Sequence, residues 1–265
     1  MKGLILSLLL AITLTPVTSQ NALRFYGLRI FVNSPDTTSR FYQENFGFEI
    51  AERTEKEIIL ETGSWPIYLE KSNDHITSSY PKVSRVGLTM ETYKLLPRID
   101  QFRLMGVSLY DSLLQRNGVG ISIPFQDPSQ NVLSLMEVQI RKVLSFEGLR
   151  IYNTGVTVGQ MDEAMSFYED ILGLEEWSRK YLPDALPLKH KSGSFAFMIH
   201  YKKGLTKNQL AYGISPQMVL ILATKNLKSF KKHLIENNIT FNSLEDSIVC
   251  QDPAGNFIEI LESRD

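Results

Sequence analysis

Glu259 is the residue whose type and setting most clearly suggest chemistry. It lies in the run FIEIL, residues 257–261. If this run is a β-strand, alternate side chains share a face, and Glu259 lies on one face with Phe257 and Leu261. A lone carboxylate between apolar neighbours can act as a metal ligand or a general base if that face lines a cavity. The alternative is a solvent-facing strand residue, which is the commoner fate of glutamate.

Two histidines are further candidates. His200 follows the apolar run FAFMI at residues 195–199, and strand alternation places it on the face opposite to Phe195, Phe197 and Ile199. This position favours a surface histidine at a strand end. His190 lies between two lysines in the run LKHK and is expected to be solvated.

Arg85 and Cys250 complete the set of candidates. Arg85 stands near the start of an apolar stretch, residues 83–88, where it could pair with a carboxylate or hold an anionic ligand. An edge-strand arginine is the favoured alternative. Cys250 is the only cysteine, so the chain has no internal disulfide, and a buried, inert thiol is expected.

These residues belong to a chain that repeats itself. The run LRFY at residues 23–26 returns as LRIY 126 positions later. The pairs Phe41-Tyr42 and Phe46-Gly47 return as Phe-Tyr and Leu-Gly at the same offset, and DPSQN at 127–131 returns as DPAGN 125 positions later. Three landmarks in one order indicate a duplicated module of about 125 residues, too long a period for a solenoid. Residues shared by both copies are interpreted as architectural, whereas differences point to function gained or lost.

Each copy is predicted to be strand, helix and several strands, used twice. In the first copy, Ser34 and Pro35 signal the start of a helix that Gly47 ends. A second helix is expected over 95–105, closed by Gly106. Strands are expected at 28–32, 57–60, 66–70, 85–90, 120–124 and 132–138.

The second copy repeats the pattern. Helices are expected over 162–172 and from Leu227 to about Asn237, with strands at 151–158, 194–201, 217–223, 247–250 and 257–262. The unit is therefore βαβββ, used four times in two pairs, which is the α+β class. The connection over 141–147 has no Pro/Gly character, so the two copies are expected to pack closely.

The repeated Asp-Pro segment has a local cause. Aspartate can bond the backbone at the first turn position, proline presets φ at the second, and glycine accepts positive φ at the fourth. This predicts a tight turn between antiparallel strands. Gln130 replaces Gly255 in the first copy, so that turn is expected to be strained or differently shaped.

The N-terminus reads as a signal peptide. Lys2 precedes an apolar run over 4–14, and small residues at 17–19 predict cleavage after Ser19. The run is too short to cross a bilayer, so we expect an exported protein, periplasmic or secreted, with no membrane attachment after cleavage. The net charge is −1 without a basic stripe, which argues against nucleic-acid partners.

Together, the opening strand, the Phe-Tyr pair, the Leu/Phe-Gly helix end and the Asp-Pro-x-Gly-Asn turn resemble the vicinal-oxygen-chelate (VOC) superfamily. That superfamily includes glyoxalase I, extradiol dioxygenases and bleomycin-resistance proteins. The resemblance covers residues 23–138 and 149–262. It implies two tandem VOC domains, each a pair of βαβββ units that forms an antiparallel cup. Such cups usually hold a divalent metal that chelates two neighbouring substrate oxygens.

The resemblance also implies where metal ligands would lie. The family's ligand positions fall at Gly27, Arg85 and Ser134 in the first copy and at Asn153, Gln217 and Glu259 in the second. The usual residues are histidine, glutamine or glutamate, so the first copy is predicted to bind no metal. The second set is made of oxygen donors alone and suits calcium, magnesium or manganese better than zinc or iron. Extradiol dioxygenases carry an acid–base histidine in the stretch that contains His200.

Two functions remain open. A structural or protein-interaction module is the third alternative if neither a metal nor a ligand is found. The first is an exported VOC enzyme, a lyase or dioxygenase in type. Its C-terminal cup would hold a metal through Asn153, Gln217 and Glu259 and act on a small molecule with adjacent oxygens. The second is a metal-free protein that binds or sequesters a small molecule, as bleomycin-resistance proteins do. Aromatic residues such as Trp65, Tyr68 and Tyr201 would then line its cups.

Overall fold

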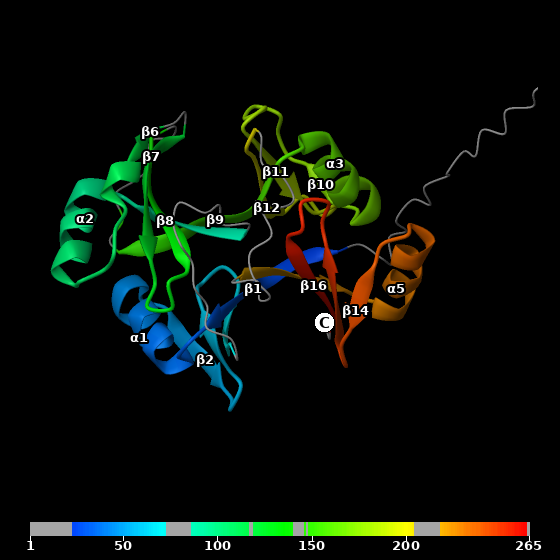
Figure 1. Ribbon diagram of the computed structural model, residues 1–265, viewed down its shortest axis with the longest axis horizontal. Coiled ribbons are helices and arrows are strands. Elements are labelled where there is room, and N and C mark those ends of the chain that lie inside the picture. Colours follow the sequence, from blue (N-terminus) through cyan, green and yellow to red (C-terminus); the bar gives the residue numbers. More distant parts are fainter. Residues whose placement is uncertain are drawn as a thin grey trace, which may run out of the picture.

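A computed structural model of the chain describes residues 23–72, 86–116, 119–139, 146, 148–203 and 218–263. The predicted signal peptide lies outside these residues. The described part contains four βαβββ units in two mixed sheets, with helices on the outer sides (Figure 1). The predicted α+β class and the four-unit architecture are confirmed. No helix within the described ranges is long and apolar enough to span a membrane.

The first two units make up the first copy. Unit 1 consists of β1 (Arg24–Val32), α1 (Pro35–Phe46), β2 (Glu49–Arg53), β3 (Glu57–Glu61) and β4 (Ile67–Lys71). Unit 2 consists of β5 (Val86–Thr92), α2 (Leu95–Leu104), the short 3-10 helix η2 (Asp111–Leu113), β6 (Gln115–Arg116), β7 (Gly120–Gln126) and β8 (Val132–Val138).

The last two units make up the second copy. Unit 3 consists of β9 (Leu149–Val158), α3 (Met161–Met165), which continues as a π-helix (Ser166–Ile171), β10 (Glu175–Glu176), β11 (Ala185–Lys189) and β12 (Phe195–Tyr201). Unit 4 consists of β13 (Met218–Thr224), α5 (Leu227–Glu236), β14 (Phe241–Ser243), β15 (Ser247–Gln251) and β16 (Phe257–Glu262).

Each sheet takes one unit from each copy. Sheet A has the strand order β14-β15-β16-β13-β1-β4-β3-β2 and joins units 1 and 4. Sheet B has the order β10-β11-β12-β9-β5-β8-β7-β6 and joins units 2 and 3. The expectation that each copy forms a cup by itself is corrected here: both cups are built between the copies. All four opening strands carry buried apolar residues on the face toward the helices, and β13 is buried on both faces. The helix-facing pattern therefore does not distinguish one pairing partner from another.

The helices pack within their own copy. In the first copy, Phe46 of α1 lies with its ring centroid 6.2 Å from Phe102 of α2, and both contact Phe125 of β7. In the second copy, His233 of α5 lies 2.9 Å from the carbonyl oxygen of Ile171. Figure 1 accordingly shows α1 and α2 on one side of the molecule and α3 and α5 on the other. Helices therefore pack together within one copy of the repeat, whereas each sheet combines strands from both copies.

Alternation along the strands separates two faces of each sheet. Leu28, Ile30 and Val32 of β1 are fully buried against the helices. The opposite face of each sheet is called the cup face below, and on β1 it carries Gly27 and Arg29. This alternation matters because it decides which polar residues can line a ligand site.

The predicted helix ends and turns are observed. The Ser34 side chain caps α1 by accepting a hydrogen bond from the Thr37 amide, and Gly47 ends the helix with a φ of 71°. Gln130 adopts a φ of 65°, close to the 88° of Gly255, so the first copy keeps the same turn at the expense of a strained residue. Cys250 is buried, and burial raises its pKa to about 12, in line with the predicted inert thiol.

Candidate functional site

The best-defined polar cluster lies on the cup face of sheet A and centres on Arg29. Its Nε donates to Oε2 of Glu259 at 2.9 Å. Its Nη1 donates to Glu57 at 2.8 Å and to Glu70 at 2.7 Å. One guanidinium therefore holds three carboxylates, from β16, β3 and β4. We call Arg29, Glu57, Glu70 and Glu259 the arginine cluster.

Strand order explains why these residues meet. Glu57 and Glu70 lie directly opposite each other in the β3–β4 pair, where two like charges would repel without a cation. Tyr68 is the β4 partner of Arg29 in register, and its ring centroid lies 5.4 Å from the guanidinium carbon. Glu259 lies two strands away from Arg29 on the other side, beyond β13.

The floor between Arg29 and Glu259 is apolar. Val219 of β13 is opposite Arg29 and Ile221 is beside Glu259 in register, and both are buried. Ser247 of β15 donates its hydroxyl to Oε1 of Glu259 at 3.0 Å. Both carboxylate oxygens of Glu259 therefore have a donor, which offsets the cost of burying its charge.

The arginine cluster has more acidic groups than basic ones. Burial by itself lowers the pKa of Arg29, but Glu259, Glu70 and Glu57 together raise it above its ordinary value, so the guanidinium stays charged. Burial, aided by a hydrogen bond with Tyr26, raises the pKa of Tyr68. The cluster thus contains three carboxylates and one fixed cation, an arrangement that disfavours an anionic ligand.

The predicted metal ligands do not come together in one cup. Glu259 lies in sheet A, whereas Asn153 lies on β9 of sheet B, opposite Thr89. Gln217 and Arg85 lie outside the described residues. Ser134 is the β8 partner of Thr89, so Asn153, Thr89 and Ser134 form a row of neutral polar side chains across sheet B. The expectation of a C-terminal cup that holds both Asn153 and Glu259 is therefore wrong, because the two residues belong to different sheets.

Gly27 shows why one ligand position carries no side chain. A Cβ atom at Gly27 would lie 2.6 Å from the carbonyl oxygen of Pro66, which is backbone and cannot move aside cheaply. The Pro66 oxygen is itself bound by the Leu28 amide at 3.2 Å. A histidine or glutamate ligand at this position would therefore displace the edge of β4.

A divalent metal does not fit the described part of the arginine cluster. Both oxygens of Glu259 are committed to Arg29 and Ser247, and a metal next to Glu259 would face the charged guanidinium. Across the described ranges, no group of three or more His, Cys, Asp or Glu residues has a geometry that could hold a metal ion. The calcium, magnesium or manganese site expected from the sequence is not supported by these contacts.

The two histidines both differ from expectation. His200 does lie on the face opposite to Phe197 and Ile199, but this is the cup face of sheet B, where burial lowers its pKa. His190 is buried, not solvated: its Nδ1 lies 2.9 Å from the Leu23 carbonyl oxygen, and its Nε2 accepts from the Phe25 amide at 2.8 Å. It fastens the start of β1 to the second copy. His200 was misjudged because apolar strand residues face the helices, which leaves the polar alternates for the cup. His190 was misjudged because the backbone groups that it contacts, at Leu23 and Phe25, are far away in the sequence.

Arg29 was missed in the sequence, although a signal was present. It interrupts the run LRIFV at residues 28–32, an apolar strand in which a charge is as unusual as Glu259 is in its own strand. Two opposite charges, each alone on an apolar strand, predict a buried pair if the strands share a sheet. The repeat adds a second signal, because the residue 126 positions later is Gly155.

Comparison with known proteins supports the fold. No protein-family model matches the chain, and no curated protein matches it. Among solved structures, glyoxalase I from Zea mays superposes with a TM-score of 0.66 at 14% identity, covering 91% of this chain and 92% of that chain. A candidate dioxygenase from Bacillus subtilis superposes with a TM-score of 0.64 at 12% identity, covering 92% and 86%. The chain therefore has the fold of the VOC superfamily, with two tandem domains.

Proposed function

We propose that the chain is an exported protein of VOC fold that binds a small molecule on the cup face of sheet A without using a metal. The observation that carries this proposal is the 2.9 Å contact between Arg29 and Glu259. Where the fold family uses a metal to gather acidic ligands, this chain supplies a guanidinium. Export rests on the leader-like segment over residues 1–19.

The arginine cluster has the parts of a binding site. Val219 and Ile221 offer an apolar floor, and the ring of Tyr68 flanks the guanidinium. Among the described residues, the hydrogen bonds of Arg29 all involve its Nε and Nη1, and none involves Nη2. That nitrogen can donate to a carbonyl or hydroxyl oxygen of a ligand. The three carboxylates favour a neutral ligand over an anion, so an uncharged molecule with adjacent oxygens is the expected class.

The test measures metal content and ligand binding on the same protein, residues 20–265. Catechol and 2,3-butanedione serve as neutral probes with adjacent oxygens, and binding is followed by calorimetry with and without a chelator. We expect less than stoichiometric metal, saturable binding of at least one probe and no effect of the chelator. Arg29→Met should weaken binding by about tenfold, the typical worth of a charge-assisted hydrogen bond.

Arg53→Met is the matched control, since Arg53 also pairs with a carboxylate, that of Asp36, but does so at the exposed surface. Stoichiometric metal that is lost in Glu259→Gln would reject the proposal and restore the metal-assisted enzyme. Probe binding that disappears with the chelator would have the same consequence. Equal effects of Arg29→Met and Arg53→Met would show that the probes bind elsewhere.

A further inference from the structure

Four polar side chains on the cup face of sheet B carry no fixed charge. Asn153 of β9, Thr89 of β5 and Ser134 of β8 form the row described above, and His200 of β12 lies on the same face. All four are half-buried. We call these four residues the neutral set. It contrasts with the arginine cluster of sheet A, in which every member is charged.

Strand order shows which positions of the two sheets correspond. Strands β9, β5 and β8 neighbour one another in the same order as β1, β13 and β16. In sheet A, the row in register across these strands is Gly27, Ile221 and Glu259. Ser134 therefore stands where sheet A has Glu259, and a hydroxyl replaces a carboxylate.

The same comparison applies to the centre of the arginine cluster. Gly155 follows Arg29 by 126 positions, which is the offset of the repeat. His200 corresponds to Glu70, because each pairs with the residue two positions further along the opening strand. Sheet B thus lacks the guanidinium that joins the carboxylates of sheet A, and an imidazole takes the place of one carboxylate.

Two glycines leave room on this face. Gly87 is directly opposite Gly155 in the β5–β9 pair. Within the described part of the chain, a Cβ atom added at Gly87 would meet nothing within 4 Å, so the space above it is open. At Gly155 such an atom would lie 3.1 Å from Cδ2 of His200, so the imidazole ring stands beside this space. Sheet B therefore has room for a ligand where sheet A has the Arg29 side chain.

The neutral set has no side-chain partner among the residues that the structure describes: none of its four side chains makes a hydrogen bond or an ion pair there. Burial lowers the pKa of His200 from the ordinary 6.5, so its ring is neutral at pH 7, with one donor and one acceptor nitrogen. Hydroxyl and amide side chains likewise both donate and accept. A half-buried polar group without a protein partner is satisfied by water or by a ligand. A ligand that satisfies this set must therefore both donate and accept.

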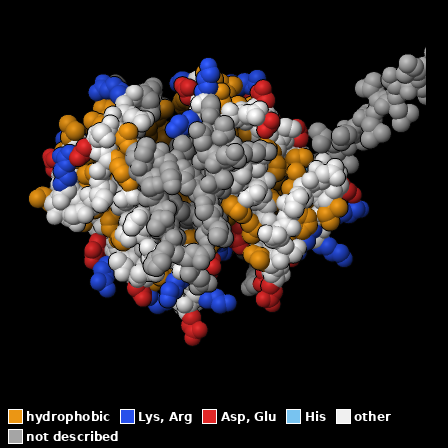
Figure 2. Space-filling model, viewed as in Figure 1, with side chains coloured by type: hydrophobic (Ala, Val, Ile, Leu, Met, Phe, Trp, Pro, Cys, Tyr) orange, Lys and Arg blue, Asp and Glu red, His pale blue; other side chains and the backbone are white. Residues whose placement is uncertain are grey.

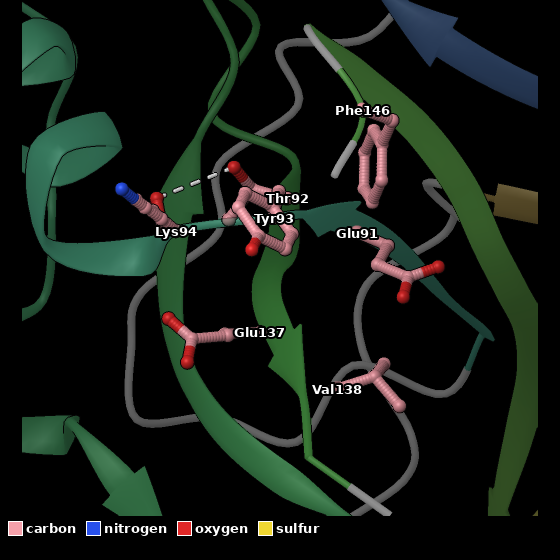
Figure 3. Close-up of a pocket in the computed structure, with 7 residues that line it drawn as sticks. All are labelled: Glu91, Thr92, Tyr93, Lys94, Glu137, Val138 and Phe146. Carbon is pink, nitrogen blue, oxygen red and sulfur yellow. Dashed lines mark hydrogen bonds between the residues drawn. The ribbon is translucent and has the colours of Figure 1, made fainter. Parts of the chain in front are cut away.

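The cup face ends at an ion pair. Glu91 lies two residues beyond Thr89 and lines a cavity of about 300 Å³ at the carboxyl ends of β5 and β8 (Figure 3). Its carboxylate already accepts from Nε of Arg150 at 2.9 Å, so its charge is balanced. Charges of both signs are interspersed on the molecular face drawn in Figure 2. That face therefore has no strong field of one sign that would attract a charged ligand.

We infer that the cup face of sheet B binds a small uncharged molecule through a planar amide group. The amide takes the place that the Arg29 guanidinium has in sheet A, because an amide is planar and uncharged and both donates and accepts. It bonds His200 and Asn153, and the rest of the molecule lies over Gly87. The inference does not depend on the function proposed for sheet A, because it uses no residue of the arginine cluster.

The test compares three planar probes of the same shape: benzamide, which is neutral, benzamidine, which is cationic, and benzoate, which is anionic. Amide shifts of residues 20–265 are followed by nuclear magnetic resonance. We expect saturable shifts with benzamide at 87–89, 134, 153–157 and 198–200, and none at these residues with the two charged probes. Asn153→Leu should weaken benzamide binding by about threefold to tenfold, the worth of one hydrogen bond between neutral groups.

Gly87→Val is the sharper variant, because it fills the open space with a residue that strands favour. Benzamide binding should fall by more than tenfold. Ala51→Val is the matched control, since it also adds a branched side chain to a strand, but at an exposed position of β2 in sheet A. It should leave binding unchanged.

Three results would overturn the inference. The first is binding of benzamide to Gly87→Val as tightly as to the parent. The second is a set of benzamide shifts centred on sheet A, or equal shifts of the sheet B residues by a charged probe. The third is no saturation by benzamide below about 10 mM, the weak limit for a ligand of this size.

Discussion

Nε of Arg29 lies 2.9 Å from Oε2 of Glu259, although the two residues are 230 positions apart and their strands do not pair with each other. The contact crosses β13 and joins the first unit of the chain to the last. The assembly of sheet A therefore completes a polar site, because the Glu259 carboxylate meets its cation only when both copies are in place. The first prediction follows from it.

Arg29→Met should destabilise the protein by roughly 2 kcal/mol or more at neutral pH, because it leaves Glu57, Glu70 and Glu259 facing one another in a largely buried space. The deficit should shrink in acid, where carboxylates take up protons. Urea unfolding of parent and variant at several pH values measures it. Arg53→Met removes an exposed pair and should cost less than about 1 kcal/mol. Equal costs for the two variants would contradict a special role for Arg29.

Gln130→Gly should stabilise the protein by about 1 kcal/mol. Gln130 has a φ of 65°, in the left-handed region that glycine alone adopts without strain. Gly255 occupies the same turn position in the second copy, with a φ of 88°. The reciprocal Gly255→Gln should therefore destabilise by a similar amount. Thermal unfolding of both variants measures the effect, and stabilisation by both or by neither would show that the turn is not the cause.

Tyr168→Phe should cost more stability than Tyr42→Phe. The two tyrosines are repeat equivalents, each fully buried and each donating to the aspartate of its Asp-Pro turn. The distance is 2.9 Å from Tyr168 to Asp252 but 3.4 Å from Tyr42 to Asp127. Loss of a good hydrogen bond to a buried charge costs about 1–3 kcal/mol, and loss of a long one costs less. Denaturant unfolding measures the stability of the two variants. A larger loss for Tyr42→Phe than for Tyr168→Phe would show that the hydrogen-bond distances do not explain the difference.

His190 should contribute a pH-dependent part of the stability. Burial lowers its pKa from the ordinary 6.5, so the folded protein releases a proton that the unfolded chain keeps. This contribution is complete above about pH 6.5 and is lost as the pH falls below that value. His190→Gln should flatten the difference in unfolding free energy between pH 7 and pH 5, because a glutamine amide can bond both Leu23 and Phe25 without titrating.

Asp127 has the opposite effect on how stability depends on pH, and this determines which control is needed. Burial raises its pKa from 3.8 to about 6, so its contribution to stability increases as the pH falls through that window. The comparison must therefore be made between parent and His190→Gln at each pH, which cancels the aspartate. A variant with an unchanged pH profile would mean that His190 does not titrate on unfolding.

The sequence by itself determined the local architecture. Ser34, Pro35 and Gly47 set the ends of α1, because capping and backbone preferences act over a few residues. The Asp-Pro turns and the strain at Gln130 followed for the same reason. Alternation placed Glu259 on the face of its strand opposite to Ile258 and Ile260, and the repeat revealed four βαβββ units. All these features depend on contacts between near neighbours in the chain.

Only the tertiary structure decided which units share a sheet and which charges meet. Four opening strands that are all apolar toward the helices can pair in several ways, and the choice of β1 with β13 and β5 with β9 separated Asn153 from Glu259. The same choice brought Arg29 to Glu259 and buried His190 against β1. These contacts join residues more than 160 positions apart. Their energies depend on packing between whole units, which no local pattern of residues encodes.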